Sequence, residues 1–437
     1  GVDRAFTQEQ IKEIVYDLLV VLLVSLLLTF EVLVIITSNV GEPLRVLKGA
    51  LESLERGKGI DVRLAGQSSD TMRIIKGVSD ILAWVRARAS AADDDLGPPA
   101  APTRRFSPVL IRAPLFVFFF AEELSRSFFP IFVREMEAPP MGLSPELVVS
   151  LPMVLFMLIV ALSQPFGGAW ADRLGARRMM LVGSLLGTVG LALTATASGL
   201  LPLLAWRGLT ALGYGLVFVA GQTYVIANTD ASNRSWGLAM FVGAVLAASI
   251  CGPAIGGILA ERLGYRETFV AGAMLAAVAG LLAVHLLSPR SETAPTARPL
   301  RWKDLGTVLR SPSFLGIVFL GAIPAKVVLT GFLYYRAPLY LEEVGTSPSA
   351  IGRIMMIYGI AMVVLTPLTA KLADRLGRPL PFVVLGGLLS GAGLMAVLWL
   401  EGAPMMVVAI LVLGIAQALS VTPQLTMVPS ACAEECR

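Results

Sequence analysis

The sequence is dominated by apolar segments of roughly twenty residues, each followed by a short polar turn. A segment of about 20 apolar residues is long enough for a helix to cross the hydrocarbon core of a bilayer. Only 15% of the 437 residues are charged and 56% are hydrophobic, whereas a soluble domain carries about 25% charged residues. The pattern therefore predicts an all-α membrane protein that crosses the bilayer many times.

The remaining composition narrows the function. The net charge is only +4, and no basic patch is interleaved with aromatic residues, so no nucleic-acid partner is expected. His285 is the single histidine, and Cys251, Cys432 and Cys436 have no metal-type spacing. We also find no pairing of a nucleophile with a base, so we expect no metal, no cofactor and no enzyme activity.

The N-terminal region predicts a membrane anchor followed by a relay. Residues 1–40 contain a short extracytoplasmic segment and a spanning helix over 18–36, because the basic stretch that follows should lie in the cytoplasm. Residues 41–90 hold two amphipathic stretches joined by a glycine-containing connector, and they resemble a HAMP domain. That resemblance implies a signal-relay module and a homodimer through its helices. An amphipathic hairpin lying on anionic membrane lipid is the alternative.

After a linker rich in Asp, Pro and Ala over 91–107, ten further membrane helices are predicted. A long basic loop over 289–312 separates a six-helix half, 108–288, from an incomplete four-helix half, 313–437. The predicted helices lie near 108–134, 146–171, 178–198, 200–226, 236–261, 267–287, 313–341, 348–373, 380–400 and 404–428.

The two halves contain a repeated turn. "GGAWADRLGARR" begins at Gly167 and "TAKLADRLGRPL" begins at Thr369, and their aspartates are 202 residues apart. A glycine allows the chain to reverse tightly, an aspartate can accept hydrogen bonds from a helix N-terminus, and the arginines hold the turn in the cytoplasm. The residues of this turn motif are Gly168, Asp172, Arg173, Gly175, Arg177 and Arg178 in the first copy, and Asp374, Arg375 and Gly377 in the second.

These turns resemble the cytoplasmic loop signature of the major facilitator superfamily. "RGLTALGYG" from Arg207 resembles the family's fourth-helix signature, and "GPAIGG" resembles the fifth-helix signature associated with antiporters. The fifth-helix motif residues are Gly252, Pro253, Gly256 and Gly257. The resemblance covers roughly 108–430 and implies a helical bundle of two six-helix halves related by a pseudo-twofold repeat. The last two helices would then follow Arg437.

Among the charged residues inside predicted membrane helices, the candidates for transport and proton coupling are Glu122, Glu123, Arg126, Arg207 and Lys326. Placing a charge at the bilayer centre costs at least about 2.5–3.5 kcal/mol of insertion free energy, so we expect these residues to have a structural or functional role. Glu123 and Lys326 are 203 residues apart, close to the repeat offset, and could face each other across a central cavity. We expect one of the glutamates to take up a proton, with the cations tuning its proton affinity or holding an anionic group. A structural ion pair between helices is the alternative, and Tyr334 and Tyr335 are expected at the membrane interface.

The sequence therefore predicts a secondary transporter of a small solute, coupled to protons, in a bacterial inner membrane. The fifth-helix motif favours export, and the HAMP-like region would supply a regulatory input. A membrane receptor that uses the bundle as its sensor or output is the second hypothesis. No GxxxxGK[ST] signature is present, so an ion gradient would have to drive transport.

Overall fold

The computed structural model describes residues 15–22, 108–136, 142, 144–229, 234–287, 315–376, 378–399 and 402–435. The predicted HAMP-like region 41–90, the linker 91–107 and the loop 289–312 lie outside these residues. The same is true of the predicted spanning helix over 18–36, except for its first residues, since residues 15–22 are helical.

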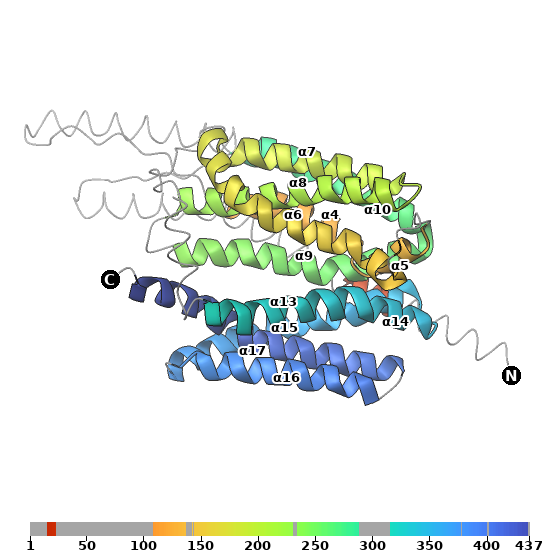
Figure 1. The fold of residues 1–437 in the computed structure, drawn as a ribbon. Coiled ribbons are helices and arrows are strands. Elements are labelled where there is room, and N and C mark those ends of the chain that lie inside the picture. Colours follow the sequence, from red (N-terminus) through yellow and green to blue (C-terminus); the bar gives the residue numbers. More distant parts are fainter. Residues whose placement is uncertain are drawn as a thin grey trace, which may run out of the picture.

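The described residues form a bundle of helices that run side by side (Figure 1). Eight of these helices are long and apolar enough to cross a membrane. The first part of the bundle contains η2 (Pro108–Ile111), α4 (Arg112–Glu123), α5 (Phe129–Arg134), α6 (Pro145–Leu174), α7 (Ala176–Ala195), α8 (Leu200–Ala227), α9 (Arg234–Leu263) and α10 (Tyr265–Leu286). The second part contains η3 (Ile317–Ala322), α13 (Ile323–Val327), η4 (Val328–Arg336), α14 (Ala337–Glu343), α15 (Pro348–Leu376), α16 (Leu380–Trp399) and α17 (Ala403–Glu435).

Local sequence signals explain several helix ends. Ser144 lies before Pro145 at the start of α6, and its hydroxyl accepts a hydrogen bond from the Leu147 N–H at 3.4 Å. Ser347 precedes Pro348 at the start of α15 in the same way and accepts from the Ala350 N–H at 3.4 Å. Each Ser-Pro pair therefore begins a long helix.

Two glycines make the tight turns between consecutive helices. Gly175 joins α6 to α7 with φ +79°, and Gly264 joins α9 to α10 with φ +110°. Side chains rarely adopt such angles, so glycine is required where two helices reverse without a loop. These turns lie at opposite ends of the bundle, which we name the Gly175 end and the Gly264 end. Gly175 of the turn motif thus lies at one of these tight turns.

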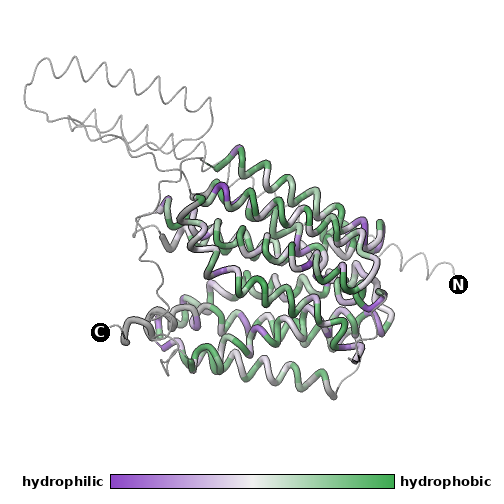
Figure 2. The backbone as a smooth tube through the Cα atoms, turned by 45° about the horizontal axis from the view of Figure 1, so that its top comes forward, coloured by the Kyte–Doolittle hydropathy of each residue, from purple (hydrophilic) through white to green (hydrophobic). Residues whose placement is uncertain are grey.

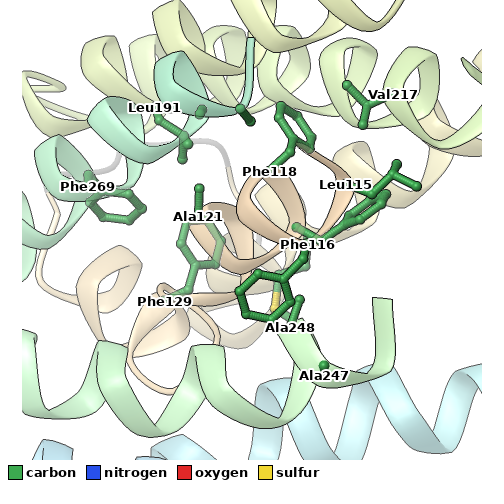
Figure 3. Packing of buried hydrophobic residues seen from close by; sticks show 14 of the residues in the cluster. Leu115, Phe116, Phe118, Ala121, Phe129, Leu191, Val217, Ala247, Ala248 and Phe269 are labelled. Atoms are coloured by element: carbon green, nitrogen blue, oxygen red, sulfur yellow. The ribbon is translucent and has the colours of Figure 1, made fainter. Parts of the chain in front are cut away.

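The core of the first half surrounds α4. Leu115, Phe118 and Ala121 of this helix are almost completely buried. They pack among side chains of α7, α8, α9 and α10, which include Leu191, Val217, Ala248 and Phe269 (Figure 3). Because α4 is enclosed on most sides, its charged residues must find partners within the protein.

The two halves meet along α9 and α15, and again where α5 touches α14. The hydropathy of the chain follows this arrangement, since apolar residues run along the helices and polar residues gather near their ends (Figure 2). A bundle of this kind exposes an apolar belt to its surroundings, which is the arrangement of a protein embedded in lipid.

Candidate functional site

The first membrane helix is interrupted at its charged residues. A single helix was predicted over 108–134, but α4 ends at Glu123 and α5 begins at Phe129, so that prediction is wrong. Between them the Phe128 N–H donates to the Ser125 carbonyl at 3.2 Å, three residues back. Pro130 explains the break, since it lacks an N–H and its ring clashes with the carbonyl four residues earlier, that of Arg126.

Glu122 and Arg207 form a buried two-bond ion pair. The Nη2 and Nη1 groups of Arg207 on α8 donate to the two carboxylate oxygens of Glu122 at 2.7 and 3.4 Å. The two residues are only 1% and 3% exposed. The guanidinium also lies against the rings of Phe129 and Phe156, at 4.5 and 4.7 Å from their centroids. Paired donors on both oxygens make this the stronger of the two carboxylate contacts in the site.

Glu123 and Arg126 form a second pair along the interrupted helix. The Nε of Arg126 donates to Glu123 Oε2 at 3.2 Å, and both residues are buried. The Arg126 guanidinium lies 4.9 Å from the centroid of Tyr334, which comes from η4 in the other half. This pair therefore lies where the two halves approach each other, and its carboxylate is held by one hydrogen bond instead of two.

A small cavity adjoins both arginines. Its volume is about 10 Å³, roughly the room that a single water needs. Among the described residues, the buried Nε of Arg207 has no hydrogen-bond partner. The cavity thus combines apolar walls with cationic groups, one of which retains a free donor. It is lined by Ser125, Arg126, Phe129, Met153, Phe156, Met157, Arg207 and Tyr334.

Lys326 lies on an irregular helix. It belongs to the short α13, between the π-helical turns of η3 and η4. Its ammonium is within electrostatic reach of Glu123 and Arg126. Within the described part of the chain, however, it makes no ion pair with either glutamate. The described residues thus show no direct contact between Glu123 and Lys326, and their encounter across a cavity stays a prediction.

Two glutamines of α17 stabilise this irregular segment. Gln417 donates to the Ala325 carbonyl at 3.2 Å, and Gln424 donates to the Ile317 carbonyl at 3.4 Å. Pro324 interrupts the regular ladder of backbone hydrogen bonds between these points. Turns of π-helix are often found at functional sites, and Lys326 lies between two such segments.

The fifth-helix glycines lie at the closest helix contacts of the site. A Cβ added to Gly252 would collide with Glu123, and one added to Gly256 would collide with the backbone of Leu124. A Cβ on Gly257 would meet the backbone of Pro348 at the start of α15. Pro253 lies inside the continuous α9. The motif therefore brings α9 against the charged break in the first helix and against the second half.

The turn motif is described only in part. Arg177 donates to the Val284 carbonyl of α10 at 2.7 Å, which fastens the Gly175 end of α7 to its neighbour. Arg178 and Arg375 are exposed, and Gly168 has open space around its Cα. The side chains of Asp172, Arg173 and Asp374, and all of Gly377, lie outside the described structure, so their roles stay predictions.

Sequence reasoning missed the aromatic residues of the site. Tyr334 was assigned to the membrane interface, but it lines the cavity and lies on Arg126, so that assignment is wrong. Phe156 contacts the guanidinium groups of both arginines, 5.8 Å from Arg126 and 4.7 Å from Arg207. Nothing in the pattern around Phe156 distinguishes it from the apolar residues that surround it on α6.

Comparison with known proteins decides the family. Residues 115–437 match the family described as "Major Facilitator Superfamily". The chain belongs to the major facilitator superfamily. Members of this superfamily are transporters and not enzymes, and the chain is accordingly a multi-pass membrane protein.

Among curated proteins, the chain is 29% identical over 226 residues to the "Multidrug resistance protein MdtG" of Citrobacter koseri. It is 27% identical over 226 residues to the protein of the same name from Escherichia coli. These matches cover 50% of this chain and 55% and 54% of the relatives. The chain thus spans about half the length of the curated relatives it matches.

Two solved structures share the fold. A bacterial homologue of the human lysosomal transporter Spinster, in an inward-facing and unoccupied conformation, has a TM-score of 0.58 at 15% identity. That similarity covers 75% of this chain and 78% of the homologue. A D-xylose–proton symporter has a TM-score of 0.52 at 14% identity, over 75% of this chain and 87% of the symporter.

Proposed function

We propose that this protein is a secondary transporter that moves a small solute by alternating access and is driven by protons. The observation that carries the proposal is the presence of two buried carboxylate–guanidinium pairs at a break in the first membrane helix, Glu122–Arg207 and Glu123–Arg126. Ionised groups at such a position are costly, and in membrane proteins they typically mark ion or substrate pathways.

The two pairs suggest different roles for the two glutamates. Glu122 is held by two hydrogen bonds from Arg207 and is enclosed on all sides, which suits a structural anchor between α4 and α8. Glu123 is held by one hydrogen bond, beside a residue of the other half. When the halves separate, Arg126 would lose its contact with Tyr334, and Glu123 would become free to exchange its partner for a proton. We therefore assign proton coupling to Glu123.

The contacts between the halves support alternating access. At the Gly264 end, Arg134 of α5 pairs with Glu342 and with Glu343 of α14. The hydroxyl of Tyr335 donates to the Glu146 carbonyl at 2.9 Å at the same end. Basic residues of the turn motif lie near the Gly175 end, so the positive-inside rule assigns the Gly264 end to the outside. The protein would then be closed outward, and rocking of two related halves would open it.

The bounds of the helices add support for two related halves. Helices α6 and α15 begin 203 residues apart, each at a Ser-Pro pair, and α7 and α16 both contain 20 residues. Parallel repeats of this kind place the transport site at their interface. The charged cavity lies between the two halves, because Tyr334 comes from one half and the remaining lining residues come from the other.

We propose export as the direction and a solute that tolerates apolar walls as the cargo. The relatives are named multidrug resistance proteins, and the cavity walls combine methionine and phenylalanine with arginine. Regulation by the HAMP-like region 41–90, and dimerisation through it, remain predictions from the sequence.

The test is transport in proteoliposomes that enclose the pH dye pyranine. With an imposed proton gradient, we expect the full chain to move ethidium and to carry protons in the opposite direction. Glu123→Gln should abolish both movements, whereas Glu146→Gln, which changes an exposed acid on α6, should leave them unchanged. Ethidium movement that survives in Glu123→Gln with undiminished proton flux would refute the assignment of proton coupling.

A further inference from the structure

A short helix at the N-terminal side of the chain, residues 15–22, lies across the seam between α9 and α15. Val20 is only 4% exposed. It packs in a cluster with residues of both helices, namely Ile250, Cys251, Ala254 and Ile258 of α9 and Met356 of α15. Leu18, Leu19 and Leu22 face away and are exposed. One face of the segment is therefore seated on both halves of the bundle.

Asp17 makes an ion pair with each half. Its Oδ2 accepts from Arg262 in the last turn of α9 at 3.3 Å, and its Oδ1 accepts from Arg353 in the second turn of α15. The ring of Tyr16 lies 5.8 Å from the Arg353 guanidinium. The side chain of Asp17 is 13% exposed, so this carboxylate is largely withdrawn from solvent between two cations.

Helices α9 and α15 approach each other closely near this carboxylate. A Cβ on Gly257 of α9 would collide with the backbone of Pro348, and a Cβ on Gly352 of α15 would collide with the backbone of Pro253. Among the described residues, Glu261 also faces this region, and it accepts from the Ser349 N–H at 3.0 Å. Without Asp17, Arg262 and Arg353 would lose the carboxylate that they share across this joint.

We propose that residues 15–22 act as a clamp on the seam between α9 and α15, which stabilises the conformation closed at the Gly264 end and is released when the segment moves. Any rocking of the halves must change the geometry between Arg262 and Arg353, and one carboxylate cannot follow both. The clamp therefore links the position of the N-terminal segment to the transport cycle. This inference rests on the alternating-access function proposed above.

The test measures the bundle directly and needs no transported solute. Spin labels are placed at Leu174 of α6 and Leu376 of α15, which are exposed at the Gly175 end of the two halves. The native cysteines are first replaced by Cys251→Ala, Cys432→Ser and Cys436→Ser. Without the clamp the bundle should open at the Gly264 end and close at the Gly175 end, where the labels lie. In the full chain, Asp17→Asn should therefore shift the population of molecules toward the shorter label distance by about fivefold, the factor expected for a partly buried ion pair.

Two further variants keep the test decisive. Asp17→Glu retains the charge and should restore the original distance distribution. Glu267→Gln removes an exposed acid at the same end and should leave the distribution unchanged. Suppose that the label pair shows both a shorter and a longer distance, and that Asp17→Asn leaves their proportions unchanged. The clamp is then overturned, while alternating access stands. A single fixed distance under every gradient, without ethidium movement, would instead overturn the proposed function and the clamp with it.

Discussion

Removal of the Arg207 guanidinium should destabilise the bundle strongly. In Arg207→Met, Glu122 would remain 1% exposed with neither of its two hydrogen-bond donors. Breaking a buried ion pair in this way costs about 3–5 kcal/mol, because an uncompensated charge stays buried. The contacts of the guanidinium with Phe129 and Phe156 would also be lost, but methionine packs well against aromatic rings and should recover most of their contribution. We therefore expect a net loss of about 4 kcal/mol.

The double variant Glu122→Gln/Arg207→Met isolates the contribution of the charge. It removes both ionised groups and keeps similar volumes, so it should cost only about 1–2 kcal/mol relative to the native protein. The measurement is unfolding in mixed micelles of dodecylmaltoside and SDS, followed by the fluorescence of Trp206 and the other tryptophans. Arg134→Met provides the exposed control and should cost no more than about 1 kcal/mol, because its partners are partly solvated.

A double-mutant cycle tests this reasoning. It compares the costs of Glu122→Gln and Arg207→Met, each made alone, with the cost of the double variant. The reasoning is refuted if the two single substitutions add up to the cost of the double one, because additive costs mean that the two side chains do not interact.

Three further outcomes follow from the contacts of the bundle. Gly256→Ala should lower the melting temperature of the detergent-solubilised protein, because the added methyl group meets the backbone of Leu124 and overpacking costs about 1–3 kcal/mol. The control is Gly391→Ala, which should not lower the melting temperature because Gly391 has open space. Gly175→Ala should cost about 1–3 kcal/mol in the micelle unfolding assay, since alanine is strained at φ +79° and ψ 151°. An unchanged midpoint would show that the turn adopts another conformation. Tyr334→Leu should slow ethidium transport more than Tyr334→Phe does, because phenylalanine keeps a ring over the adjoining guanidinium; equal rates would show that this ring contact has no part in the cycle.

Much of the architecture could be predicted because it depends on periods and turns along the chain. Helix bounds near Pro145, Leu200 and Pro348 follow from caps and apolar length, which are local properties. The same local reasoning predicted one helix over 108–134, although a proline such as Pro130 typically interrupts a helix. Apolar length favoured continuity, whereas the proline and the need to pair the charges favoured interruption.

The candidate site was predictable in its members but not in their pairing. Charges inside apolar runs are conspicuous, so Glu122, Glu123, Arg126 and Arg207 were identified from the sequence. Which carboxylate meets which arginine depends on the approach of α8 to α4, and that approach depends on packing between residues 85 positions apart. The same reason explains why Lys326 is near Glu123 without touching it.

The sequence by itself determined that the chain must span a membrane many times. The apolar length of a segment is a local property, and it sets whether a helix can cross the hydrocarbon core of a bilayer. It also determined where most helices turn, because glycine, proline and serine act on the backbone at their own positions. Only the tertiary structure decided that Glu122 is anchored to Arg207, that Tyr334 belongs to the cavity, and that Asp17 bridges α9 and α15. Those contacts join segments distant in the chain, and their geometry is settled by close packing of the whole bundle, which no local pattern encodes.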